Sequence, residues 1–167
     1  SGCISLALLS HLPQAKVTGW DINPLALRMT RFNLNRNHID PACLTLRQCD
    51  LFAVSSVDCD VLVSNPPYIK SSAFESLVSP SVRRWEDWRA LIDRGNRNGT
   101  AFHLKLLELF GNSLQCRLLA MELDGTWTQL NSIIRHVPRH QSYSVLRDHS
   151  DRPRAILVKK HCAALQG

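Results

Sequence analysis

Short apolar segments of strand length alternate with segments of helical spacing along most of this sequence, and this alternation limits its fold more than any other feature. The expected strands cover 16–20, 44–49, 61–64, 117–123, 143–146 and 155–159, and the expected helices cover 24–37, 101–110 and 126–137. Strands alternating with helices predict an open α/β sheet that is mostly parallel and covered by helices on both faces. The short turn "RDHSDRPR" predicts that the last two strands pair antiparallel.

A single partial domain is expected over residues 1–167. With 167 residues and 44% hydrophobic side chains, the chain is large enough for one sizeable core, and no Gly/Ser/Pro-rich linker divides it. Its opening, "SGCISLALLSHLP", lacks Met and passes directly into helical spacing, with Gly2 suited to a tight turn that normally follows a strand. We therefore expect the first strand of the fold to be missing, and this chain on its own to be unstable or free of cofactor.

Metal and membrane roles are not expected. The sequence has no HExxH motif, no Cys/His cluster with zinc spacing, and no apolar run near the ~20 residues of a membrane helix. Its cysteines show neither CxxC pairs nor regular spacing, which favours reduced core thiols of an intracellular protein. These cysteines are Cys3, Cys43, Cys49, Cys59, Cys116 and Cys162.

The net charge of +6 favours an acidic partner, such as a nucleic acid or a ribonucleoprotein. Two basic stretches, "SVRRWEDWR" and "IIRHVPRH", are candidates for phosphate binding. Solvated helix faces would give the same pattern, so both interpretations stay open.

The positions just after the strands are the candidate ligand-binding residues, because open α/β sheets bind ligands outside the carboxyl ends of their strands. Asp21 lies about 20 residues after the glycine turn, where a nucleotide-binding fold places an acid that binds ribose hydroxyls. Alternatively, Asp21 caps the following helix. Asp50 could accept a hydrogen bond from the amine of an adenine, with Leu51 and Phe52 offering apolar surface to its ring, or it could be a solvated turn acid.

The sharpest signal is the run Asn65-Pro66-Pro67-Tyr68, directly after four residues of strand character. The prolines fix their own φ and restrict the residue before them, so the Asn65 amide is held in one orientation. Asn65 Oδ1 and the Pro66 carbonyl can then accept both N–H bonds of a planar –NH2 group, while the Tyr68 ring stacks on the group that carries it. An ordinary loop is the alternative.

This run resembles the NPPY motif of S-adenosylmethionine-dependent amino-group methyltransferases, and the chain as a whole resembles the HemK-type glutamine-N5 methyltransferases. The similar segments are "SGCISLALL", "GWDINPLALRMTRFN", "QCDLF", "SNPPYIK", "VRRWEDWRAL" and "RDHSDRPRAILV". The resemblance implies a Rossmann-like class I methyltransferase sheet whose first strand and N-terminal helical domain are absent here. Two places depart from the family pattern, Asp87 after Glu86 and the loop "IDRGNRNG".

The resemblance also implies a function and a site. The cofactor would be S-adenosylmethionine, contacted by Gly2, by Asp21 at the ribose, and by Asp50 and Leu51 at the adenine. The run Asn65–Tyr68 would bind a glutamine side-chain amide of a peptide chain release factor, in the cytoplasm or a mitochondrion. Two alternatives remain open: an adenine-N6 methyltransferase acting on DNA or RNA, which needs the same geometry for a flipped base, and an inactive remnant or interaction domain.

Overall fold

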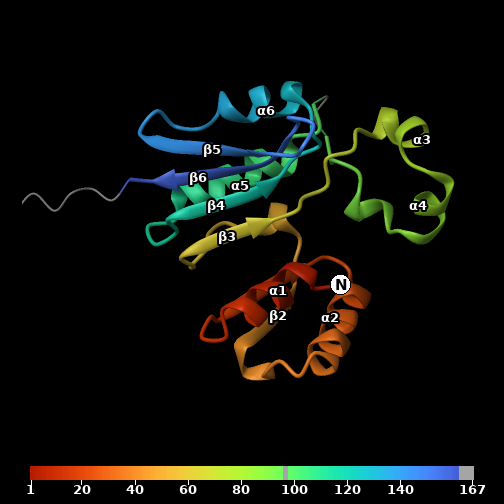
Figure 1. Ribbon diagram of the computed structural model, residues 1–167, viewed down its shortest axis with the longest axis vertical. Helices are drawn as coiled ribbons and strands as arrows, with labels where there is room; N and C mark the ends of the chain where they lie inside the picture. Colours follow the sequence, from red (N-terminus) through yellow and green to blue (C-terminus); the bar gives the residue numbers. More distant parts are fainter. Residues whose placement is uncertain (96–97, 162–167) are drawn as a thin grey trace, which may run out of the picture. The chain divides into compact units, whose positions relative to one another are not determined.

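The computed structural model describes residues 1–95 and 98–161, which form two compact units. The first unit covers Ser1–Val54 and the second begins at Ser55 (Figure 1). Part of the loop "IDRGNRNG" and Cys162 lie outside the described residues.

Two parallel strands and two helices make up the first unit. Its elements are α1 (Cys3–His11), β1 (Val17–Asp21), α2 (Pro24–Arg36), η1 (Pro41–Cys43), β2 (Leu44–Gln48) and η2 (Leu51–Ala53). Strands β1 and β2 pair in a register that runs from Val17 opposite Leu44 to Asp21 opposite Gln48. Because the two strands point the same way, both end at one edge of this small sheet.

Helix α2 begins where its sequence provides a cap. The Asn23 side chain accepts a hydrogen bond from the backbone N–H of Leu25, and Pro24 stands at the first helical position. Leu27 and Leu34 lie on the buried face of α2, and Leu6 and Leu9 lie on that of α1. These four side chains form the apolar centre of the first unit.

A four-stranded mixed sheet forms the second unit, in the order β3-β4-β6-β5. Its elements are β3 (Val61–Ser64), α5 (Ala101–Asn112), β4 (Leu118–Glu122), α6 (Trp127–Ile134), β5 (Gln141–Arg147) and β6 (Pro153–Lys160). Strand β3 pairs parallel with β4, whereas β6 lies antiparallel between β4 and β5. The predicted antiparallel pairing of the last two strands is therefore confirmed.

The core of the second unit lies where α5 and α6 meet the sheet (Figure 1). Leu109, Phe110 and Ile133 on the helices are fully buried, as are Leu119 and Ile156 on the strands. Burying several such side chains is the main favourable term for a domain of this size, at roughly 1.5–3 kcal/mol each.

A segment of short helices separates β3 from α5. It contains η3 (Ser71–Ala73), α3 (Phe74–Leu77), α4 (Pro80–Trp85) and η4 (Trp88–Ala90). A parallel bridge between Ile69 and Ile92 closes its base. The Ile69 N–H donates to the Leu91 carbonyl at 2.9 Å, and the Asp93 N–H donates to the Ile69 carbonyl at 2.9 Å. The two ends of this segment of short helices therefore lie side by side, close to the end of β3.

The α/β class and most expected elements agree with the structure, but three features differ. The described strands form two sheets, β1-β2 and β3-β4-β6-β5, rather than the one open sheet expected. Because β6 lies between β4 and β5, two of the three strand pairs in the second unit's sheet are antiparallel, which the linear spacing does not reveal. Helix α6 ends at Ile134 rather than at residue 137, because the residue before Pro138 is disfavoured in the helical conformation.

No helix among the described residues is both long and apolar enough to cross a membrane.

The Cys59 and Cys116 sulfur atoms lie 3.9 Å apart as free thiols. Burial, reinforced by Cys116, raises the pKa of Cys59 to about 12. The Cys59 thiol is therefore a poor nucleophile at neutral pH.

Candidate active site

Gly2 precedes α1 and lies tightly against α2. Its backbone is left-handed, with φ 75° and ψ 14°. A Cβ atom at this position would come within 2.3 Å of Thr30 Cγ2, so no side chain fits there. The Gly2 carbonyl accepts a hydrogen bond from the Leu6 N–H at 2.9 Å and so starts the helix. Packing explains the glycine, and its contact with a cofactor stays a prediction.

Asp21 is the last residue of β1 and is half-buried. Its Oδ1 accepts a hydrogen bond from the Asn23 backbone N–H at 2.8 Å, in the turn before α2. The alternative role as the cap of α2 is wrong, because Asn23 caps that helix. Asp21 therefore holds a turn at the strand end and presents a carboxylate there, as a ribose ligand requires.

Asp50 lies at the same edge of the first unit, just beyond β2. The Cys49 N–H donates to the Asp21 carbonyl at 3.0 Å, which continues the β1–β2 ladder to this point. Asp50 Oδ1 accepts a hydrogen bond from the Phe52 N–H at 3.1 Å and caps the short helix η2. Leu51 is half-buried and Phe52 is 40% exposed, so apolar surface follows the acid as predicted.

The structure places the motif Asn65–Tyr68, here called the NPPY loop, in the second unit directly after β3. Asn65 is exposed, Pro66 is buried, and Pro67 and Tyr68 are half-buried. Since β3 and β4 pair in parallel with Ser64 opposite Met121, the NPPY loop starts at the edge where β4 also ends. The last residue of β4 is Glu122.

Tyr68 faces this end of β4. Burial raises the pKa of its phenol, and the nearby Glu122 carboxylate raises it further, while Arg154 acts in the opposite direction. Arg154 Nη2 lies 3.7 Å from Glu122 Oε1. The phenol is therefore neutral at physiological pH.

Gly99 packs against the last residue of the NPPY loop, and Gln129 binds Gly99. A Cβ atom on Gly99, whose φ is 68°, would approach the Tyr68 carbonyl oxygen to 2.3 Å. Gln129 is 1% exposed; its Nε2 donates to the Gly99 carbonyl at 2.8 Å, and its Oε1 accepts from the Asp124 N–H at 2.9 Å. One buried amide thus connects the residues after β4 to the residues that support Tyr68.

His103 is a structural residue of α5. It is fully buried, and its Nε2 lies 2.9 Å from the Glu122 carbonyl oxygen, which fixes Nε2 as the donor. Its Nδ1 is buried without a hydrogen-bond partner among the described residues. A side chain sealed in this way supports the end of β4 and cannot reach a substrate.

The structure groups the predicted residues into two sets. Asp21, Asp50 and Leu51 share the strand-end edge of the first unit, Gly2 lies against Thr30 of α2, and the NPPY loop belongs to the second unit. Sequence reasoning missed Glu122, although the strand-end rule that selected Asn65 applies equally to β4. It also missed Gly99, Gln129, His103 and Arg154, for which the linear sequence carries no local signal.

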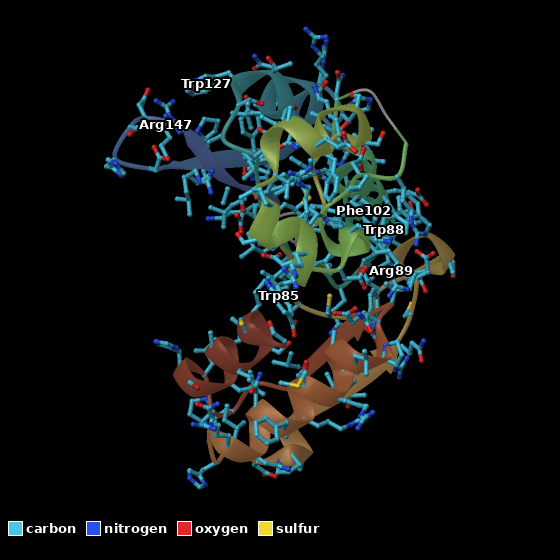
Figure 2. All side chains as sticks on the ribbon, turned by 90° about the vertical axis from the view of Figure 1, so that its right-hand side faces the viewer. Trp85, Trp88, Arg89, Phe102, Trp127 and Arg147 are labelled. Carbon is cyan, nitrogen blue, oxygen red and sulfur yellow. The ribbon has the colours of Figure 1, made fainter. Side chains whose placement is uncertain are left out.

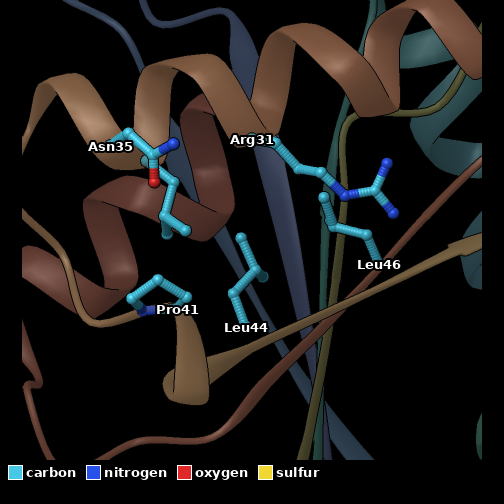
Figure 3. Close-up of a pocket in the computed structure, with 6 residues that line it drawn as sticks. Arg31, Asn35, Pro41, Leu44 and Leu46 are labelled. Carbon is cyan, nitrogen blue, oxygen red and sulfur yellow. The ribbon is translucent and has the colours of Figure 1, made fainter.

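A hollow of about 250 Å³ lies between α2 and β2 in the first unit (Figure 3). It is lined by Arg31, Leu34, Asn35, Pro41, Leu44 and Leu46. Pro41 and Leu44 stand at the beginning of β2, whereas Asp21 and Asp50 lie at the carboxyl ends of the strands. The hollow is therefore separate from the candidate cofactor residues.

Known proteins give consistent comparisons. The family model described as methyltransferase small domain matches residues 1–84. The release factor glutamine methyltransferase of Fusobacterium nucleatum is 32% identical over 163 residues, which are 96% of this chain and 45% of that protein. The protein of the same name from Moorella thermoacetica is 33% identical over 160 residues, which are 95% of this chain and 55% of that protein. This chain thus spans about half the length of these relatives.

A solved structure supports the fold. A methyltransferase from Pyrococcus furiosus superposes with a TM-score of 0.65 at 18% sequence identity, covering 97% of this chain and 71% of that one. At this identity, the likeness concerns the fold alone. It agrees with the predicted Rossmann-like class I methyltransferase sheet.

Replacing Gly99 with alanine should destabilise the full-length protein by about 2–4 kcal/mol, because the new Cβ meets the Tyr68 carbonyl and the left-handed backbone disfavours a side chain. Urea unfolding measures the loss, and hydrogen exchange should show faster exchange around Tyr68. Gly111→Ala is the matched control, since nothing lies within 4 Å of its added Cβ. Equal stabilities of the two variants would contradict the described packing.

The burial of His103 predicts a pH effect on stability. Burial lowers the pKa of its imidazole. Below pH about 6.5 the unfolded chain binds a proton that the folded protein does not, so stability is complete above that pH and falls as the pH drops toward the folded pKa. Between about pH 7.5 and 5.5, the wild type should lose about 1 kcal/mol more than His103→Gln in urea unfolding. The control His140→Gln, at an exposed position, should keep the wild-type pH dependence.

Proposed function

Because this chain belongs to the methyltransferase small domain family, we propose that the protein carrying it methylates the side-chain amide nitrogen of a glutamine in a peptide chain release factor. The observation that carries the proposal is the NPPY loop, placed at a strand end and supported by Gly99 and Gln129. The names of the two bacterial relatives support this acceptor over an adenine. A release factor acts in translation, so we place the reaction in the cytoplasm or a mitochondrion.

The cofactor of the proposed reaction is S-adenosylmethionine, which supplies a methyl group on a sulfonium. The first unit fits its binding at the end of its strands, where Asp21 ends β1 with a carboxylate and Asp50 follows β2, and the Gly2 backbone is the proposed contact for the methionine part. We propose that Asp21 binds the ribose hydroxyls and that Asp50 and Leu51 contact the adenine. Acids and apolar groups at strand ends are typical of nucleotide sites in such sheets.

The NPPY loop addresses the chemical difficulty of this acceptor. The nitrogen of a carboxamide is a poor nucleophile because its lone pair is delocalised into the carbonyl. We propose that Asn65 Oδ1 and the Pro66 carbonyl accept its two N–H bonds, which raises electron density on the nitrogen and orients it. The neutral Tyr68 ring stacks on the planar amide.

Positioning supplies most of the rate enhancement in this proposal. An amide fixed between two acceptors meets the methyl group in line, and fixed dipoles stabilise the positive charge that develops on the nitrogen. Forming the new N–C bond would break the S–CH3 bond and leave a neutral thioether, and the methylated nitrogen would then lose one N–H proton to solvent, so bond formation itself needs no general base. His103 is accordingly sealed in the core rather than placed at the loop.

Asp21→Ala in the full-length protein should weaken cofactor binding by about 1.5–3 kcal/mol, because a charge-assisted pair of hydrogen bonds to the ribose is lost. Calorimetric titration with S-adenosylmethionine measures this change. Asp40→Ala is the control, since Asp40 Oδ1, like Asp21 Oδ1, accepts a hydrogen bond from the backbone N–H two residues on, here that of Ala42. Unchanged cofactor affinity in Asp21→Ala together with collapsed turnover would assign Asp21 a different role.

Asn65→Ala should lower turnover by about 10²–10³ while leaving cofactor affinity intact, as expected for deleting one preorganised hydrogen bond. Asn112→Ala, an exposed amide at the end of α5, is the matched control. The assay supplies methyl-labelled cofactor with either a release factor or nucleic acid, and mass spectrometry locates the label. Label on adenine and none on glutamine would favour the adenine-N6 alternative, and no label on any acceptor would favour the inactive remnant.

A further inference from the structure

Most of the net positive charge of the chain lies in one short segment. Residues 135–161 contain seven Lys or Arg residues against two Asp residues, so this segment carries +5 of the net charge of +6. Four of the seven histidines lie there as well. A concentration of this kind marks a surface for an anionic partner.

The fold arranges these charges along β5, an edge strand of the second unit. Strand β5 has seven residues and is about 20 Å long. Exposed cations precede it at the end of α6 and follow it in the hairpin to β6. We define the β5 stripe as Trp127, Arg135, Arg139, Tyr143, Arg147 and Arg152.

Two large aromatic side chains lie among these cations. Tyr143 on β5 is 47% exposed, and Trp127 at the start of α6 is 45% exposed. The Arg147 guanidinium lies 4.9 Å from the centroid of the Trp127 ring, and Figure 2 shows the two residues together beside the hairpin. Exposed aromatic rings among arginines are the surface on which unpaired bases stack.

The two acids of the segment do not lie along the strand, because both follow the end of β5. Asp148 Oδ1 accepts hydrogen bonds from the backbone N–H groups of Ser150 and Arg152, and the bond from Arg152 holds the pKa of Asp148 below its ordinary value. Asp151 Oδ1 lies 2.9 Å from Arg147 Nη1. Both carboxylates thus shape the hairpin turn.

We propose that the β5 stripe binds single-stranded RNA, with its arginines on the phosphates and with Tyr143 and Trp127 under the bases. A purely acidic partner would explain the charges but would give the two exposed rings no role. The choice of RNA over DNA rests on the proposed function, because a release factor meets RNA in translation. Since β3 and β5 are opposite edges of one sheet, this surface lies apart from the NPPY loop.

The test measures the binding of a fluorescein-labelled, single-stranded RNA of about 15 nucleotides to the full-length protein by fluorescence anisotropy. Surfaces of this kind accommodate a strand of about that length. Arg139→Ala/Arg152→Ala should lower the salt slope of binding by about 1.4, so the affinity loss should be about sevenfold larger at 50 mM than at 200 mM salt. Arg28→Ala/Arg36→Ala removes the same charge from exposed positions on α2 and should leave the slope unchanged. Equal losses in both variants would overturn the proposal.

A second pair of variants tests the stacking. Tyr143→Ser should weaken RNA binding at least about fivefold, whereas Tyr143→Phe keeps the ring and should bind as the wild type does. Circular dichroism confirms that both variants fold. An unchanged affinity in Tyr143→Ser would overturn the assignment of a nucleic acid, and a DNA strand bound as tightly as RNA would overturn the choice of RNA. These binding measurements do not depend on which group the enzyme methylates.

Discussion

Parallel pairing of strands is the constraint on which both sets of candidate residues depend. When two neighbouring strands point the same way, their carboxyl ends meet at one edge, and the residues that follow them become neighbours. In the first unit this brings Asp21 and Asp50 to the end of the β1–β2 pair. In the second unit it places Asn65 beside the end of β4, where Glu122 lies.

Close packing then limits the motion of the turns at these edges. Gly2 and Gly99 both have left-handed backbones and both lie where a Cβ would collide with a neighbour, Thr30 in one case and the Tyr68 carbonyl in the other. The buried Gln129 amide adds hydrogen bonds in two directions from α6. A loop that must hold an amide in one orientation benefits from such support, because errors of about 1 Å in position cost large factors in rate.

Charge and chemistry are divided between the two edges of the second sheet. The NPPY loop follows β3 and offers acceptors and an aromatic ring to a small planar group. At the other edge, β5 is about 20 Å long and carries Tyr143 and Arg147, and the remaining residues of the β5 stripe come from the segments before and after it. A chemical site and an extended binding surface on one sheet would let an enzyme recognise more of its surroundings than the group it modifies.

The sequence by itself determined the α/β class, the extent of most elements and the NPPY motif. These follow from local rules: strand and helix spacing repeat over a few residues, and two prolines restrict an asparagine wherever they occur. The tertiary structure decided that β6 lies between β4 and β5, that Asn23 rather than Asp21 caps α2, and that Gly99 and Gln129 support Tyr68. The strand order and the Gly99–Gln129 contact depend on residues that are far apart in the sequence, such as Leu118 and Lys159. The cap of α2 depends on which of two nearby side chains reaches the end of the helix. The residues that are adjacent in the sequence do not determine these contacts.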